Sequence, residues 1–448
     1  MVSLGFTYNQ VWANQIIPLD DFGVSPSIVI GDDGFPVIVY STDQASIILL
    51  KCSSNDCSSF DPDSPQTLGN LGGNFHAEVT IGIDTFPVVA FYNGTNGEVG
   101  LFHCLSIDCQ DNDPPVIFDS VGIGGPFPKI SIEIGNDGFP AIVYNHRTAP
   151  DIKFVHCRTI SCADVGLPSF DPPITVNLDG FESNPSMAIG TDNFPIISNA
   201  DGAGGGTLEV HHCSTIDCTG SIFHRNVIFF SAVPIDTSIV IGTDTFPTIV
   251  YHDRDNSELQ LVHCTSIDCS TNDDVVVLDS NEEVGQNNSI AIGIDGYPII
   301  SYQDLTNHSL KVVHCKNINC SLFDEPVVLD SVFSGIIDSS ITIGSDGLPL
   351  IVYNRSTAGL NLVKCSTVTC NPLHFPPCST PNSEDLIIDS SCVLEIDFTT
   401  PANVIVQNNS VLMIPNGITL TVPTGFNITI LSGGGVLIKS GGTLQVLS

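Results

Sequence analysis

The chain has 448 residues, of which 49 are acidic and only 12 are lysine or arginine, so its formal net charge is −37. This charge excludes a nucleic-acid-binding protein, because phosphate backbones are bound by clustered cations. Charged residues make up 14% of the chain and apolar residues 42%, which is the composition of a folded protein rather than a disordered one. No apolar run approaches the roughly 18 residues of a membrane helix. The first 20 residues lack the basic start and apolar core of a signal peptide, which has either been removed or never existed.

The chain begins with an apolar, aromatic arm, MVSLGFTYNQVWAN, over residues 1–14. The arm carries Phe6, Tyr8, Val11 and the single tryptophan, Trp12. It precedes the first repeated segment, so it has no place within the repeat itself. We expect it either to pack on the C-terminal segment or to insert into a neighbouring subunit in a head-to-tail contact, which would make copies of this chain its partner.

Residues 15–375 contain seven copies of a unit of about 52 residues. Each unit opens like residues 27–40, SIVIGDDGFPVIVY, and continues with an apolar stretch that ends at a cysteine. The I-x-I-G run alternates with period two, G-x-D-G predicts a hairpin that needs positive φ, and the proline begins the return strand, where no ladder donor is required. Four short strands per unit predict an all-β, seven-bladed β-propeller, with a β-solenoid as the alternative.

Residues 15–22, QIIPLDDF, have the pattern of an outer strand, whereas the seventh unit ends after Cys370 without one. We therefore predict that the N-terminal strand completes the last blade. Such a strand closes a ring whose first and last edges would otherwise be unpaired.

The sixteen cysteines form eight sequence pairs, which we predict to be disulfides. Seven pairs are spaced C-x4-C and one is longer: Cys52/Cys57, Cys104/Cys109, Cys157/Cys162, Cys213/Cys218, Cys264/Cys269, Cys315/Cys320, Cys365/Cys370 and Cys378/Cys392. Structural zinc is the alternative, but the pairs are too far apart in sequence to share ligand sets of four. Disulfides indicate an oxidising, extracellular or cell-surface location.

Two repeated polar positions are candidates for chemistry. The hairpin aspartates Asp33, Asp84, Asp137, Asp192, Asp244, Asp295 and Asp346 suggest a ring of calcium sites, but one carboxylate per hairpin is too few for calcium, so we expect each to bond its own turn. A histidine precedes the first cysteine in five units (His103, His156, His212, His263 and His314), with Lys51 and Lys364 in the other two. We expect these to be exposed strand residues that do not converge on a metal. No cofactor is therefore expected.

The loops after the return strands differ between units and carry Arg147, Arg254 and Arg355. Variable loops on a rigid scaffold are common binding sites, so these arginines are candidates for binding an acidic sugar. The nucleophile, metalloprotease and phosphate-loop motifs G-x-S-x-G, H-E-x-x-H and G-x-x-x-x-G-K are absent, and we expect no enzyme.

From residue 376 to 448 the pattern changes to strictly alternating short strands with Gly or Pro-Asn-Gly punctuation. This predicts a small β-solenoid or β-sandwich. Its last strand contains Leu444 and Val446 and has no charged residue after Lys439, so we expect it to contact another chain. Seven N-x-S/T sequons are glycosylation candidates: Asn93, Asn287, Asn307, Asn319, Asn354, Asn408 and Asn427.

The unit I-G-x-D-G-x-P-x-I-x-Y followed by V-H-C-x4-C resembles repeats of secreted bacterial and archaeal proteins that are thought to be propellers, and the tail resembles a β-rich segment of such surface proteins. The resemblance implies a cell-surface or extracellular location without a defined activity. Sialidase-type propellers are a more distant comparison, and their S-x-D-x-G-x-x-W box is not matched. Our leading hypothesis is a non-enzymatic structural subunit of a head-to-tail filament. A carbohydrate-binding propeller, acting as a lectin or adhesin, is the alternative, and a glycoside hydrolase is a third.

Overall fold

A computed structural model describes residues 14–448 except 43–45, 71–74, 123–128, 147–150, 165–166, 178–182, 202–205, 231–234, 332–337, 356–358, 372–377, 382–383, 390–391, 395, 408–409, 415–417, 433–434, 439–442 and 448. The described residues form strands and turns only, and they divide into two compact units, residues 1–370 and 371–448. In the described part of the chain no helix is long and apolar enough to span a bilayer.

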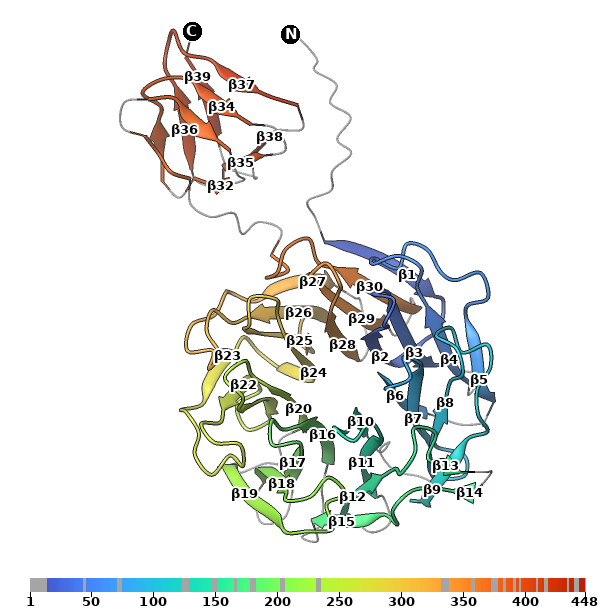
Figure 1. Cartoon of the computed structure of the whole chain (residues 1–448). Helices are drawn as coiled ribbons and strands as arrows, with labels where there is room; N and C mark the ends of the chain where they lie inside the picture. Colours follow the sequence, from blue (N-terminus) through green and yellow to red (C-terminus); the bar gives the residue numbers. More distant parts are fainter. Residues whose placement is uncertain are drawn as a thin grey trace. The chain divides into compact units, whose positions relative to one another are not determined.

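The first unit is a seven-bladed β-propeller, as predicted (Figure 1). Each blade is a four-stranded antiparallel sheet whose first strand lies nearest the axis. Blade one contains β2 (Val24–Ile30), β3 (Pro36–Ser41), β4 (Ser46–Lys51) and β5 (Gln66–Asn70). Blade two contains β6 (Phe75–Ile81), β7 (Pro87–Asn93), β8 (Glu98–His103) and β9 (Val116–Ser120). Blade three contains β10 (Ile130–Ile134), β11 (Pro140–His146), β12 (Asp151–His156) and β15 (Ile174–Asn177), with β13 (Ala163–Asp164) and β14 (Leu167–Pro168) as a separate ribbon.

The remaining blades repeat this order around the axis. Blade four contains β16 (Ser183–Ile189), β17 (Pro195–Asp201), β18 (Thr207–Cys213) and β19 (Ile222–Phe229). Blade five contains β20 (Ile235–Ile241), β21 (Pro247–Asp253), β22 (Glu258–His263) and β23 (Val276–Asp279). Blade six contains β24 (Val284–Ile292), β25 (Pro298–Asp304), β26 (Ser309–His314) and β27 (Val327–Ser331), and blade seven contains β28 (Ser339–Ile343), β29 (Pro349–Arg355) and β30 (Gly359–Lys364).

The N-terminal strand closes the ring as predicted. Strand β1 (Gln15–Asp20) pairs antiparallel with β30, with Gln15 opposite Lys364 and Ile17 opposite Leu362. It is therefore the outer strand of blade seven, next to blade one (Figure 1). Ile17 also packs against the apolar cluster between these two blades.

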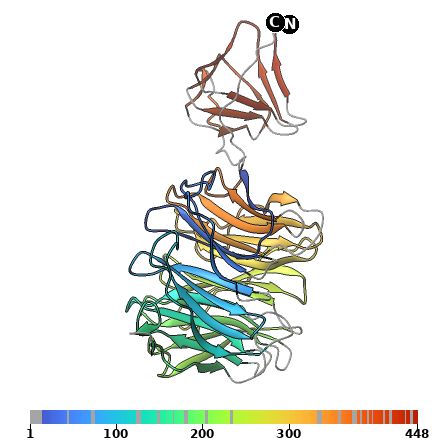
Figure 2. The same cartoon turned by 90° about the vertical axis from the view of Figure 1, so that its right-hand side faces the viewer.

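Two faces of the propeller follow from the strand directions. On the hairpin face, each first strand ends in its G-x-D turn and each third strand ends in its C-x4-C corner; on the loop face, first strands begin and second strands end. The residue after the hairpin aspartate has positive φ, as predicted; it is glycine in four blades, such as Gly34 at 84°, and a non-glycine residue in three, such as Thr85 at 73°. Figure 2 shows the propeller from its side.

The apolar core lies between blades rather than within them. Among the described residues, one buried apolar cluster spans each junction between neighbouring blades. At five of these junctions an isoleucine from the C-x4-C corner of one blade contacts the blade before it. The isoleucine packs on the glycine that starts the preceding blade's hairpin. A Cβ added to Gly82 would lie 2.6 Å from Oδ1 of Asp84 and 2.9 Å from Cδ1 of Ile160, so a larger residue there would require both side chains to shift.

All eight predicted disulfides are formed, and they leave no free cysteine. The seven corner bridges and the longer one pair the cysteines in the predicted way: Cys52–Cys57, Cys104–Cys109, Cys157–Cys162, Cys213–Cys218, Cys264–Cys269, Cys315–Cys320, Cys365–Cys370 and Cys378–Cys392. The corner cysteines are all buried. Each corner bridge closes on its own blade, so the bridges brace single corners rather than joining blades.

The backbone of the second cysteine in each corner differs from the sequence-based expectation. The sequence pattern predicts positive φ only in the G-x-D-G hairpins, yet the second cysteine of every corner also has φ between 51° and 57°: Cys57, Cys109, Cys162, Cys218, Cys269, Cys320 and Cys370. This left-handed conformation is costly for a residue with a side chain. It occurs because each of these cysteines ends a tight turn, in which its amide donates to the carbonyl three residues before it, as from Cys57 to Ser54 and from Cys109 to Ser106. The C-x4-C spacing predicts the bridge but not the turn inside it.

The second unit is a β-solenoid, which decides between the two predicted alternatives. Its three parallel sheets are β31 (Leu386–Ile388), β34 (Val404–Val406) and β37 (Ile428–Ile430); β32 (Cys392–Val393), β35 (Val411–Ile414) and β38 (Gly435–Ile438); and β33 (Phe398–Thr399), β36 (Thr419–Val422) and β39 (Thr443–Val446). Apolar residues stack in register, as Leu386, Val404 and Ile428 do. Together they form one interior cluster, which the Cys378–Cys392 bridge adjoins.

Candidate functional site

The hairpin aspartates have a second role beyond the turn bond that we predicted. One oxygen accepts the expected bond from the amide two residues on, such as Phe86 N to Asp84 Oδ1 at 3.2 Å. The other oxygen pairs with the residue before the first cysteine, so Asp84 Oδ2 lies 2.7 Å from His103 Nε2. In blades one and seven the partner is a lysine, as in Lys51–Asp33 at 2.8 Å.

The prediction that the five histidines are exposed is therefore wrong. Their exposures lie between 4% and 6%: His103, His156, His212, His263 and His314. His103 is held between two carboxylates, since its Nδ1 lies 2.8 Å from Asp113. His263 and His314 are held in the same way by Asp273 and Asp324. Each pair joins the hairpin to the third strand of its own blade, so these groups connect two parts of the sheet.

A ring of polar residues lies around the axis at the loop face. Each blade contributes one residue, which stands six positions before the glycine of the I-G motif. This residue lies at or next to the start of the innermost strand. We name this ring the axial ring: Ser25, His76, Lys129, Asn184, Asp236, Asn287 and Asp338. Four members, Ser25, Asn184, Asp236 and Asn287, have φ between 48° and 61° and lie at irregularities in strand register. These bulges turn the chain where it enters each blade.

Asp236 is the centre of the axial ring's hydrogen-bond network. Its Oδ1 lies 2.9 Å from Lys129 Nζ and accepts a 2.7 Å bond from Asn184 Nδ2. Its Oδ2 accepts a 2.9 Å bond from the Asn287 amide. Asp338 accepts a 3.4 Å bond from the Ser25 hydroxyl. One lysine therefore faces a half-ring of carboxylates and amides contributed by four blades.

A second ring of side chains lies two residues further along the innermost strands. Serine occupies this position in six blades, and its hydroxyl accepts an amide bond from the next blade, as in Met187 N to Ser131 at 3.2 Å. Blade two carries Glu78 instead, and burial raises the pKa of Glu78 to about 8. Burial also raises the pKa of Glu133, two residues on from Ser131, to about 7.

The axial charges shift one another's ionisation. Burial raises the pKa of Asp338, whereas Lys129 lowers the pKa of Asp236 despite the opposing effect of its burial. Although burial works against the charged amine, the carboxylates of Asp236 and Asp338 raise the pKa of Lys129. Burial, with a smaller effect from Lys129, lowers the pKa of His76 to about 3, so His76 is neutral.

The ends of the second strands extend the site outward from the axial ring. His252 is 1% exposed, and burial lowers its pKa despite the nearby charge of Asp236. Gln303 Oε1 accepts a 3.2 Å bond from Asn287 Nδ2, and Asn354 Oδ1 accepts a 2.6 Å bond from the Asp338 amide. Polar side chains that are mostly buried therefore continue the axial network beneath the loop face in blades five to seven.

The structure describes two of the three arginine candidates. Arg355 is held by Asp330 of its own blade at 2.8 Å. Arg254 is exposed, and Arg147 lies outside the described residues.

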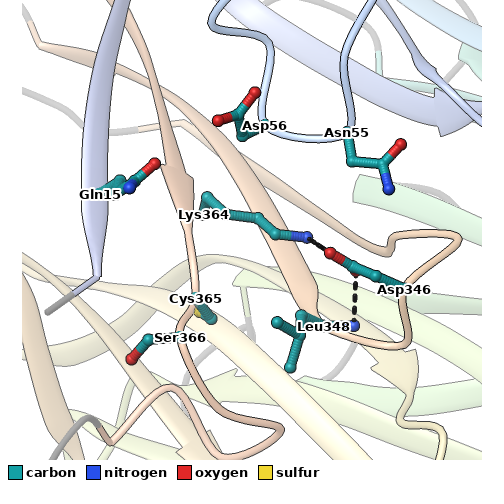
Figure 3. Close-up of a pocket in the computed structure, with 8 residues that line it drawn as sticks. All are labelled: Gln15, Asn55, Asp56, Asp346, Leu348, Lys364, Cys365 and Ser366. Carbon is teal, nitrogen blue, oxygen red and sulfur yellow. Dashed lines mark hydrogen bonds and ion pairs between the residues drawn. The ribbon is translucent and has the colours of Figure 1, made fainter. Parts of the chain in front are cut away.

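A pocket of about 400 Å³ lies on the hairpin face at the junction of blades seven and one (Figure 3). Asn55 lines this pocket and occupies the corner position that holds the locking isoleucine in five other blades. The smaller polar side chain leaves this junction less filled. Lys364 Nζ is 2.6 Å from Asp346 Oδ2 within the pocket (Figure 3), and the carboxylate of Asp56 accepts bonds from the hydroxyls of Ser54 and Ser58.

The glycosylation candidates differ in accessibility. Asn307 and Asn427 are exposed, and Asn287 and Asn319 are partly buried. Asn93 and Asn354 are only 1% and 4% exposed, which leaves no room for a glycan in the folded blade. Asn408 lies outside the described residues, as do the arm candidates Phe6, Tyr8, Val11 and Trp12. Leu444 packs on the solenoid core, whereas Val446 is 56% exposed.

Sequence reasoning missed the axial ring and the aspartate–histidine pairs. Both have a signal in the repeat alignment. A polar residue stands six positions before every I-G glycine, and a histidine or lysine stands before every first cysteine. Because strand pairing joins positions 19 residues apart, as in Asp84 and His103, spacing alone did not show these contacts.

No family model and no curated protein matches this chain. The solved structures to which it is similar include the BP39L lectin from Burkholderia pseudomallei, with 10% identity over 78% of this chain and 98% of that chain and a TM-score of 0.50. A protein of unknown function from Dyadobacter fermentans has 10% identity over 79% and 98% of the two chains, with a TM-score of 0.47. The Cps50 (Swd1) propeller domain of Myceliophteria thermophila has 8% identity over 78% and 99%, with a TM-score of 0.48. At such identities the likeness is one of fold alone, and the fold defines this chain as a seven-bladed β-propeller protein with a disulfide in each blade.

Proposed function

We propose that this chain is an extracellular, non-catalytic binding protein whose axial ring recognises a neutral, hydroxyl-rich ligand of the saccharide class. The observation that carries the proposal is the variation within the axial ring. The repeat keeps the same residue type at its structural positions, such as the hairpin aspartate and the corner cysteines, yet the axial position is serine, histidine, lysine, asparagine or aspartate. Polar residues that vary within an otherwise regular scaffold are typical of a binding surface.

The chemistry of the ring favours an uncharged ligand. Carboxylates and amides bond hydroxyl groups as acceptors and donors, whereas Lys129 is already paired with Asp236. A net charge of −37 opposes the approach of polyanions. The eight disulfides are consistent with an extracellular location.

A glycan array probed with the full-length chain tests this proposal. We expect saturable binding to one or a few glycans, weakened at least 10-fold by Asp236→Asn combined with Asp338→Asn. Asp32→Asn, an exposed carboxylate on the hairpin face, is the matched control and should bind as the parent does. Absence of saturable binding across the array, or equal binding by the double variant, refutes the axial site.

A second candidate function is self-assembly, which the solenoid supports. Strands β37, β38 and β39 each pair on one side only among the described strands. Apolar side chains nearby are exposed: Ile430 by 44%, Leu431 by 39%, Val446 by 56% and Leu447 by 41%. Open edges with apolar side chains associate with other strands. The second copy of the chain would supply those strands in a head-to-tail filament.

Negative-stain microscopy and light scattering test the assembly. We expect filaments or oligomers that Val446→Asp abolishes, while Thr443→Asp, on the same strand at an exposed position, leaves them intact. Deletion of residues 1–13 should leave a folded monomer if the arm is a contact. Filaments that persist after this deletion exclude the arm, and a parent chain that is monomeric at all concentrations excludes assembly.

A further inference from the structure

Blade four departs from the repeat at a group of adjacent positions. Two residues before the first cysteine, the other blades carry an apolar residue and blade four carries a histidine: Leu50, Phe102, Val155, Val262, Val313 and Val363 against His211. In the middle of the second strand, the others carry an aromatic residue and blade four an asparagine: Tyr40, Phe91, Tyr144, Tyr251, Tyr302 and Tyr353 against Asn199. The outer strand β19 is also longer than its counterparts, with eight residues. These changes replace apolar core with polar groups in one place.

The strand register brings three ligand-type side chains together. Glu209 and His211 are two residues apart on β18 and so lie on the same face, and β19 places His224 directly opposite His211. Glu209 Oε2 is 3.5 Å from His211 Nε2, and Glu209 Oε1 is 3.2 Å from His224 Nε2. One ligand atom from each of the three residues lies within 4.8 Å of the other two. Tetrahedral zinc with bonds of about 2.0–2.1 Å requires neighbouring ligand atoms about 3.3 Å apart. The two short separations involve different oxygens of Glu209, and His224 Nε2 also contacts Asn226 Oδ1, so binding of one ion requires small side-chain rotations.

His211 is only partly explained by contacts within the blade. Its side chain is fully buried; Nε2 has only the 3.5 Å approach to Glu209, and Nδ1 has no hydrogen-bond partner among the described residues. An unsatisfied buried polar group costs stability, and the six other blades avoid this cost with an apolar residue. The buried imidazole therefore indicates a ligand that binds to it.

Neighbouring side chains hold the carboxylate of Glu209 in place. Its Oε2 accepts a 2.7 Å bond from Asn177 Nδ2, contributed by the outer strand of blade three, and a 3.5 Å bond from Asn199 Nδ2. Its Oε1 accepts a 3.3 Å bond from the Thr207 hydroxyl. Metal-binding carboxylates are oriented by such outer contacts. Replacement of the repeat's aromatic residue by Asn199 provides both the bond and the space.

We propose that Glu209, His211 and His224 bind a single Zn²⁺ ion, with water in the fourth position. Two imidazoles and a carboxylate are a zinc ligand set, and a fourth position open to water is typical of sites that are not purely structural. The side chain of His224 is 36% exposed, so the ion can enter from solvent on that side.

The test uses the full-length, oxidised chain with any histidine tag removed. After treatment with EDTA and exchange into a metal-free buffer, the chain is titrated with ZnCl₂, and bound zinc is measured by mass spectrometry after gel filtration. We expect about one zinc per chain, and a cobalt-loaded sample with the visible absorption of a tetrahedral site. Both signals should be lost in His211→Val and reduced at least 10-fold in affinity in Glu209→Gln.

The two variants and the control come from the repeat itself, so we expect all of them to fold. Valine occupies the position of His211 in four blades, and Gln260 occupies that of Glu209 in blade five. The matched control is His212→Lys, because the adjacent His212 is replaced by lysine in blades one and seven, and it should retain the zinc. A parent chain that binds no stoichiometric zinc, or a folded His211→Val chain that keeps it, overturns the proposal. Circular dichroism confirms folding, and Glu209→Gln provides the result if His211→Val does not fold.

Discussion

Glu78 is a partly buried carboxyl where the other six blades carry serine at the same position of the innermost strand. Burial raises its pKa from 4.5 to about 8, against the lowering effect of Lys129 and Ser131, while Glu133 adds to the rise. Because the folded state binds the proton more tightly than the unfolded state, this contribution to stability is fully present below about pH 4.5. It is lost as the pH rises through 8.

We therefore expect Glu78→Gln, which mimics the protonated form, to protect the propeller at alkaline pH. The parent chain should lose more of its Tm between pH 5.5 and pH 9 than the variant does, by roughly 5 °C. Thermal unfolding followed by circular dichroism measures the difference. The exposed Glu282→Gln serves as the control, and equal losses of Tm in parent and Glu78→Gln would show that Glu78 is not protonated in the folded chain.

Two substitutions of a histidine that lies between two carboxylates should differ in their effect on stability. His103→Ala leaves the carboxylates of Asp84 and Asp113 facing each other without a cation or donor, and should destabilise the chain by about 2–3 kcal/mol. His103→Lys restores the arrangement of blade one, where Lys51 is paired with Asp33, and should cost less than about 1 kcal/mol. Urea unfolding gives both values. Equal destabilisation by the two variants would mean that packing, not charge, explains the histidine.

The contacts of single side chains were the hardest feature to predict from the sequence. The turn bond of each hairpin aspartate was predictable, because it is local to the hairpin. The pairing of these aspartates with a histidine or lysine, as in Asp84–His103, was not predictable. It depends on how the third strand pairs with the second, and on the C-x4-C corner lying on the same face as the hairpin. The prediction that the histidines before the first cysteines are exposed was wrong for the same reason.

At the scale of elements, β1 is the strand on which ring closure depends. Its removal would expose the edge of β30 and the cluster that Ile17 and Leu19 cover. We expect a chain lacking residues 1–20 to aggregate or to lose at least about 10 °C in Tm, because an unpaired edge and apolar surface favour association.

A chain lacking only residues 1–13 is the matched control for this deletion. It keeps Asn14, whose side chain donates a 2.7 Å bond to the Cys370 carbonyl and accepts a 3.0 Å bond from the Ser366 amide. Size-exclusion chromatography and thermal unfolding compare the two. If both chains stay monomeric with equal Tm, β1 does not close the ring in solution.

The elements were the most predictable level. Alternation, turn residues and proline positions indicated four strands per unit, and the borrowed strand followed from the missing outer strand of the seventh unit. For the C-terminal segment the sequence left two possible folds, a β-solenoid and a β-sandwich. Alternation shows that one face of each strand is buried, but it does not show whether neighbouring strands run parallel. Blade four's longer outer strand was not anticipated, since its sequence, IFHRNVIF, lacks the pattern of the other closing blocks.

At the scale of the whole molecule, short-range disulfides and an inter-blade core predict how the protein responds to reduction. Each corner bridge closes a loop of six residues and contributes about 2 kcal/mol in the chain-entropy model. The core between blades does not depend on them. We expect the reduced and alkylated chain to keep its β-type circular dichroism at 25 °C with a clearly lower Tm.

Calorimetry with and without reductant measures this effect, and Cys378→Ala with Cys392→Ala separates the contribution of the solenoid. Complete loss of β structure on reduction at 25 °C would contradict an independent inter-blade core. The overall architecture was predictable from the repeat, whereas the position of the axial ring was not, because it depends on which residues the seven blades bring to a common axis.

Asn55 makes the junction between blades seven and one different from the five junctions that contain isoleucine. Five blades present an isoleucine that fits the glycine of whichever blade precedes them, so on these contacts alone one blade could follow another in several orders. The first blade presents an amide instead, and its neighbour is the blade completed by β1. The closing junction therefore packs with a different side-chain chemistry from the five isoleucine junctions, so the blades are not interchangeable at the place where the ring closes.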